Sequence, residues 1–211
     1  MSLYQTPPDS ILINGEKYHI DTDFRVWMEF QGIFTSGKSD TEKAGQLYNL
    51  MERLGLPPSK PALDSMLEFY SGESHENADG SKNRPIAFDF EQDSEFIYSA
   101  FLGAYGIDLA ASQIHWWKFK ALFKSLPSDC EFCRIMGYRI TPITDVPKNQ
   151  RQFYRNMKTR YALKKQLGSG YRTEQDMRDY VKRRYEEAQA RMPTLRGSGQ
   201  SGDVRSKCES G

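Results

Sequence analysis

The segment Gln-Ile-His-Trp-Trp-Lys-Phe-Lys-Ala-Leu-Phe-Lys at residues 113–124 places apolar side chains along two neighbouring lines of a helix. The first line joins Ile114, Trp117 and Ala121, and the second joins Trp116, Phe119 and Phe123. A surface helix usually buries a single stripe, whereas two adjoining lines make a wide one. We therefore expect this helix to lie centrally in the fold.

The two tryptophans of this segment have two interpretations. Aromatic pairs beside basic residues are able to stack on nucleic-acid bases or to contact cations, and lysines follow closely here. The apolar lines through both rings are what a core helix requires, and we favour that interpretation. The predicted structural core then includes Trp27, Phe101, Trp116, Trp117 and Phe119.

Upstream of this segment, the sequence predicts a β-hairpin followed by three helices. Alternating apolar residues surround an Asn14-Gly15 pair, which favours a type I′ turn because both of its central positions need positive φ. Helices are expected at about residues 23–33, 40–54 and 60–71, where apolar residues recur with helical period. The second of these begins in a capping box, Ser39-Asp40-Thr41-Glu42.

Downstream, we expect a helix capped by Asp89 that runs to about Tyr105, a short helix near 129–138, and two long basic helices at about 147–165 and 173–191. Residues 72–86 lack an apolar period and predict a mobile acidic loop. Residues 197–211 have the Gly/Ser composition of a disordered tail. The prediction is a mainly helical single domain at 1–196 with a small N-terminal hairpin.

Charge divides unevenly along the 211 residues, although the formal net charge is only +1. Residues 1–133 carry 11 basic and 20 acidic side chains, whereas residues 134–196 carry 16 and 6. Such asymmetry indicates an electrostatic partner or contact between the two halves, and both alternatives stay open. The candidate partner-binding face combines Lys148, Arg151, Arg155 and Lys158, which share one side of the first basic helix.

Sequence motifs for catalysis or metal binding are scarce. Cys130-Glu-Phe-Cys133 lacks the second ligand pair of a structural zinc site, and the only other cysteine, Cys208, lies in the presumed tail. The chain has no Walker loop, no G-x-S-x-G and no H-E-x-x-H motif. We therefore expect no enzyme activity, no cofactor and no metal. Without a long apolar run or a leader-like N-terminus, we also expect no membrane association and a cytoplasmic protein.

Four blocks of the sequence resemble the bacteriophage gene-product-fifteen family of phages and prophages. They are Ile13-Asn-Gly-Glu-Lys-Tyr-His-Ile-Asp-Thr-Asp-Phe-Arg-Val-Trp-Met-Glu-Phe30, Tyr105-Gly-Ile-Asp-Leu109 with Ile114-His-Trp-Trp-Lys-Phe-Lys-Ala-Leu122 and Leu126-Pro127, Ile135-Met-Gly-Tyr-Arg139, and Tyr154-Arg-Asn-Met-Lys-Thr-Arg-Tyr-Ala-Leu163. The resemblance covers about residues 10–165. The family has no catalytic residues to carry over.

This resemblance implies a protein of tail morphogenesis, acting in the cytoplasm of the bacterial host as a tail assembly chaperone. Its expected partner is the phage tape-measure protein, with other tail proteins and self-association as further possibilities. Two other functions remain as alternatives. One is a nucleic-acid-binding module built on residues 147–191, and the other is a minor structural component of the virion.

Overall fold

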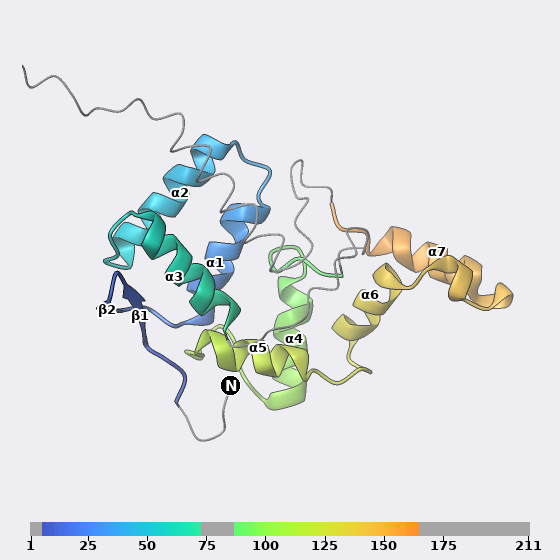
Figure 1. Cartoon of the computed structure of the whole chain (residues 1–211). Helices are drawn as coiled ribbons and strands as arrows, with labels where there is room; N and C mark the ends of the chain where they lie inside the picture. The colour runs from blue at the N-terminus through green and yellow to red at the C-terminus, as the bar shows by residue number, and fades with distance from the viewer. Residues whose placement is uncertain (1–5, 73–86, 165–211) are drawn as a thin grey trace, which may run out of the picture.

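The computed structural model describes residues 6–72 and 87–164 of the chain. In this part the fold is mainly helical with a small N-terminal hairpin, as the sequence predicts (Figure 1). The elements are β1 (Ser10–Ile13), β2 (Glu16–His19), α1 (Phe24–Thr35), α2 (Asp40–Arg53), α3 (Lys60–Ser71), α4 (Ser94–Tyr105), α5 (Trp116–Lys124), α6 (Glu131–Ile140), the 3₁₀ turns η1 (Ile143–Asp145) and η2 (Lys148–Gln150), and α7 (Arg151–Arg160).

The hairpin is antiparallel, with Ile13 opposite Glu16 and Ser10 opposite His19. Asn14 and Gly15 have φ of 52° and 85°, which is the positive-φ pair that a type I′ turn requires. Ile11 and Ile13 are buried on the face that packs against α3. The predicted hairpin is confirmed.

The first three helices begin at side-chain caps close to the positions that the sequence predicts. Asp23 accepts a hydrogen bond from the backbone N–H of Arg25 at the start of α1. At the start of α2, Ser39 and Glu42 form the reciprocal capping box, and Ser59 caps α3. These bonds satisfy backbone donors that a helix cannot satisfy itself.

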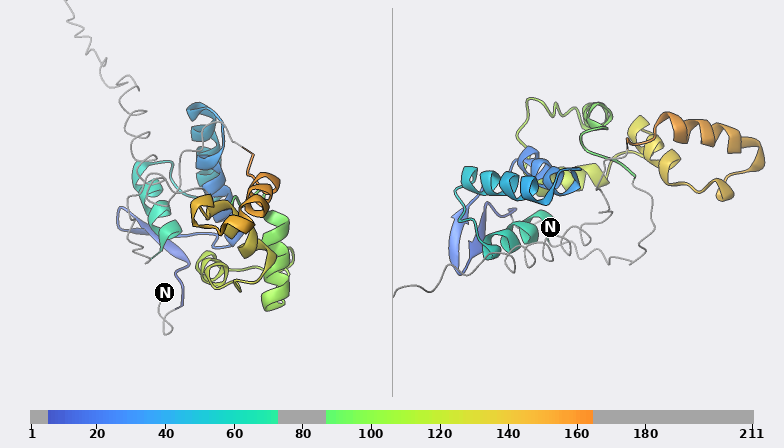
Figure 2. Two further views of the ribbon diagram at one scale, coloured as in Figure 1. Left: turned by 90° about the vertical axis from the view of Figure 1, so that its right-hand side faces the viewer. Right: turned by 90° about the horizontal axis from the view of Figure 1, so that it is seen from above.

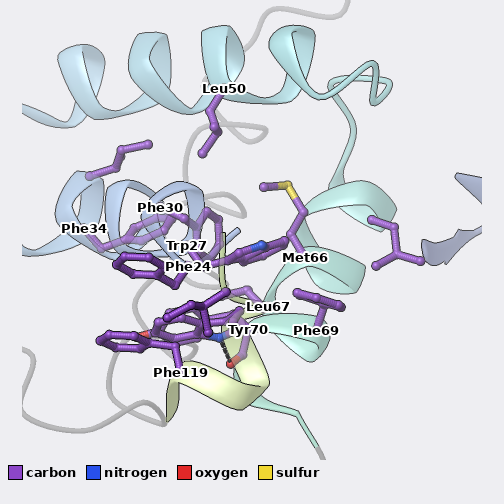
Figure 3. Close-up of a cluster of buried hydrophobic side chains, with 14 of the residues drawn as sticks. Phe24, Trp27, Phe30, Phe34, Leu50, Met66, Leu67, Phe69, Tyr70 and Phe119 are labelled. Carbon is purple, nitrogen blue, oxygen red and sulfur yellow. Dashed lines mark hydrogen bonds between the residues drawn. The ribbon is translucent and has the colours of Figure 1, made fainter. Parts of the chain in front are cut away.

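A stack of three aromatic rings lies at the centre of the core. Phe119 of α5 lies between Phe24 of α1 and Phe101 of α4, with ring centroids 4.7 Å and 5.0 Å away and planes within 7° and 3° of parallel. Side chains from α1, α2, α3 and α5 converge around it (Figure 3). Trp27, Phe101, Trp116 and Phe119 are each at most 1% exposed, while Trp117 is half-buried against the core.

Helix α5 also caps the C-terminal end of α3. The indole N–H of Trp116 donates to the carbonyl of Tyr70, and that of Trp117 donates to the carbonyl of Phe69, both at 2.7 Å. The ammonium of Lys120 donates to the carbonyls of Tyr70 at 2.5 Å and Ser71 at 2.7 Å. A cation at this place also interacts favourably with the negative end of the helix dipole.

The predicted bounds of three helices are wrong. Helix α5 begins at Trp116 after its His115 cap, so Gln113 and Ile114 lie before the helix. Asp89 does not cap α4, because its carboxylate accepts from the N–H groups of Glu91 and Gln92 and closes a turn there; α4 begins only after Asp93. The expected helix at 147–165 is shorter, since a 3₁₀ turn precedes α7 and Tyr161 ends it. The predicted loop after Gly72, the helix at 173–191 and the tail at 197–211 lie outside the described residues.

Replacing Lys120 tests the capping of α3. Lys120→Met keeps the aliphatic stem but leaves two carbonyls without this charged donor, so we expect the free energy of unfolding to fall by about 1–3 kcal/mol. Chemical denaturation measures this free energy of unfolding. The matched control is Lys118→Met on the same helix, whose exposed side chain should change stability by less than about 0.5 kcal/mol. Equal losses in the two variants would contradict this role.

We expect His115 to make the stability of the fold sensitive to acid. Its Nδ1 accepts from the N–H of Trp117 as the cap of α5, and burial lowers the pKa of the ring, aided by nearby Lys118 and opposed by the bond to the Pro8 carbonyl. Because the folded-state pKa lies below the unfolded one, stability should fall as the pH drops below about 6.5.

His115→Asn retains a capping acceptor that does not titrate. Its melting temperature should therefore fall less than that of the wild type between about pH 7 and about pH 5. The control is His19→Asn, which removes an exposed histidine of β2. An unchanged pH dependence in His115→Asn would remove His115 as the source.

Candidate partner-binding surface

The C-terminal lobe, defined here as residues 131–164, lies at the opposite end of the molecule from the hairpin (Figure 2). It consists of α6, the two 3₁₀ turns, α7 and the residues up to Lys164. Helix α7 packs against α6, η1 and η2. None of its residues is fully buried, so α7 keeps much of its surface exposed.

One buried ion pair joins the lobe to the rest of the protein. The guanidinium of Arg139 on α6 donates to both carboxylate oxygens of Asp93, at 2.6 Å and 2.8 Å, and the two side chains are 8% and 2% exposed. Arg139 also donates to the carbonyls of Ala87 and Tyr161. A bidentate pair of this kind fixes orientation as well as distance.

An aromatic cluster forms the contact between α6 and α7. Tyr138 lies with its ring centroid 5.8 Å from Phe153, 5.5 Å from Tyr154 and 6.4 Å from Tyr161. Phe153 remains 49% exposed, and Ile140 at the end of α6 is 44% exposed. The lobe therefore presents apolar surface beside its basic groups.

The four candidate residues of the sequence prediction divide into two pairs. Arg151 donates to the carbonyls of Val146 and Thr144, and Lys158 donates to the carbonyl of Arg139. These three hydrogen bonds hold the lobe together. Lys148 and Arg155 are exposed, and within the described residues neither side chain makes a hydrogen bond or an ion pair.

Between the lobe and the acidic body, the described residues form one ion pair, Arg139 with Asp93. In residues 6–72 and 87–164, no ion pair links α7 to a carboxylate. Lys164 instead exchanges hydrogen bonds with the amide of Gln92 through its backbone. Of the two alternatives left by the sequence, the described residues of α7 favour a surface that is open to a partner. Arg139 is the residue that sequence reasoning missed, because its carboxylate partner lies 46 positions away.

The contacts of Cys130 and Cys133 stabilise the start of α6. Cys130 caps α6, with its Sγ 3.4 Å from the backbone N of Cys133. Burial, followed by the interaction with Cys130, raises the pKa of Cys133 to about 11. A thiol with this pKa is protonated at neutral pH and is a poor nucleophile.

Across the described ranges, no three His, Cys, Asp or Glu side chains are grouped closely enough to hold a metal ion. The same part of the chain has no helix of the length and apolarity needed to cross a membrane.

The fold and this lobe define a small helical protein with a basic, aromatic terminal surface. The family model described as Bacteriophage Gp15 protein matches residues 5–163. The chain therefore belongs to this phage protein family, and the predicted resemblance is confirmed. Neither a curated protein nor a solved structure matches the chain significantly.

Loss of Arg139 tests the ion pair that positions the lobe. Arg139→Met leaves a buried carboxylate without its partner, and we expect the free energy of unfolding to fall by about 3–5 kcal/mol. Hydrogen exchange should show lost protection in α7. Adding Asp93→Asn should recover part of the stability, because the uncompensated charge is then removed.

Arg134→Met on the same helix is the control, since Arg134 is exposed. Its effect on stability should stay within about 0.5 kcal/mol. A double variant no more stable than Arg139→Met would contradict the ion-pair explanation.

Proposed function

We propose that this protein is a non-catalytic tail assembly chaperone that binds the tape-measure protein of its phage in the host cytoplasm. The observation that carries the proposal is family membership across residues 5–163, together with the resemblance of the four sequence blocks. The resemblance implies a gene in the tail-morphogenesis module. A chaperone of a long, aggregation-prone chain needs a binding surface and no reactive centre.

The C-terminal lobe supports this role. Helix α7 carries four basic and no acidic residues, and none of its residues is fully buried. Phe153 and Ile140 add exposed apolar surface. A partly apolar surface with a polar rim suits transient binding of amphipathic helices. Binding of this kind covers aggregation-prone segments and releases them when tail subunits assemble.

Co-expression tests the proposal. The cognate tape-measure protein should be more soluble when produced with the full-length protein than alone, and the two should be recovered in one complex. The control is Lys17→Glu, a charge reversal on exposed β2 at the far end of the molecule, which should leave recovery unchanged. No gain in solubility and no complex would refute the proposal. Purified virions that contain the protein would indicate a structural component instead.

A further inference from the structure

The positive charge of the lobe is largely uncompensated within the described structure. The lobe, residues 131–164, contains eight basic side chains and two acidic side chains, Glu131 and Asp145. Arg139 is paired with Asp93, and Arg151 and Lys158 donate to carbonyls, which carry no net charge. Uncompensated charges of one sign attract an oppositely charged partner and raise its association rate.

The exposed side of α7 carries apolar, polar and basic residues at separate positions. We call it the α7 outer face, and its exposed residues are Gln152, Phe153, Arg155, Asn156, Thr159 and Arg160. Phe153 and Arg160 are seven residues apart and so lie on the same side, at one border of the face. Arg155 lies at the other border, and amide and hydroxyl groups lie between the borders. Lys148 is exposed on η2, directly before α7.

The segments of this chain that the structure does not describe are poor occupants for this face. Residues 73–86 contain three acidic and two basic side chains, and residues 165–211 contain seven and ten. Their net charges are therefore −1 and +3, so neither segment as a whole can neutralise the net charge of +6 on the lobe. Nucleic acid is also less suited, because only two of the four cations of α7, Arg155 and Arg160, are exposed to phosphates, while Arg151 and Lys158 donate to carbonyls.

We propose that the α7 outer face binds an acidic amphipathic helix of the client protein. An apolar residue of that helix covers the exposed ring of Phe153, and its carboxylates meet Arg155, Arg160 and Lys148. Two helices packed in this way lie about 8–10 Å apart. This inference rests on the proposed chaperone function and names the chemistry of the client segment.

The test uses the full-length protein and fluorescein-labelled peptides of about 18 residues, which make about five helical turns. One peptide is an amphipathic Glu/Leu/Ala helix, the second has Lys in place of every Glu, and the third scrambles the acidic sequence. Fluorescence anisotropy gives the Kd at ionic strengths of about 0.01 M and about 1 M, where screening lengths are about 30 Å and about 3 Å.

The acidic amphipathic peptide should bind more tightly than the other two, and its affinity should fall at high salt. Arg155→Glu combined with Lys148→Glu should weaken it by at least about tenfold, and Phe153→Ser should also weaken it. The controls are Lys17→Glu for charge and Leu102→Ser for exposed apolar surface, since Leu102 is 44% exposed on α4. Both should bind as the wild type does.

Three results would overturn the inference. The first is equal binding of acidic and basic peptides, or binding insensitive to the lobe substitutions. The second is tighter binding of a duplex oligonucleotide of about 20 base pairs that the same substitutions abolish, which would assign the face to nucleic acid. The third is a salt-sensitive oligomer in light scattering that the substitutions dissociate, which would make a second copy the occupant.

Co-purification with the tape-measure protein distinguishes failure of this inference from failure of the proposed function. If the tape-measure protein co-purifies equally with wild type and with the Arg155→Glu, Lys148→Glu variant, the chaperone function stands and the α7 outer face is not its site. If neither form recovers the tape-measure protein but the acidic peptide binds the lobe, the α7 outer face still binds acidic helices and the client is a different protein.

Discussion

The parallel stack of Phe24, Phe119 and Phe101 is the constraint on which the fold depends. It joins α1, α5 and α4 through rings whose centroids lie 4.7 Å and 5.0 Å apart, and Phe101 and Phe119 have no exposed surface. Three helices that meet at one flat contact have little freedom to rotate about their axes. With α5 held in this way, its tryptophans and Lys120 reach the last carbonyls of α3, so the position of α5 also determines how α3 ends.

Helix α7 is held to the fold by weaker contacts than the core helices. No residue of α7 is fully buried, and its contact with α6 consists of half-buried aromatic rings and hydrogen bonds to carbonyls. The buried Arg139–Asp93 pair fixes the orientation of α6 relative to the start of α4, because the pair is bidentate and desolvated. A unit with little apolar burial opens locally at a lower free energy than the core, and binding surfaces are commonly drawn from such units.

The candidate site was only partly predictable. The periodicity of residues 148–158 places four basic residues on one side of a helix, but it does not distinguish side chains that hold the lobe from those that face solvent. Arg151 and Lys158 belong to the first group because nearby carbonyls accept hydrogen bonds from them, and Lys148 and Arg155 belong to the second. The importance of Arg139 depends on Asp93, which is distant in sequence, so no local pattern could indicate it.

The sequence by itself determined the helical class, the hairpin with its Asn14-Gly15 turn, and the starts of α1 and α2, because periodicity, turn chemistry and capping act within a few residues. It also located the change of charge along the chain and indicated the family. Only the tertiary structure decided that Asp93 serves Arg139, that α4 begins five residues after Asp89, and which cations of α7 remain open to a partner. Those outcomes depend on long-range contacts and on burial, which no local segment specifies.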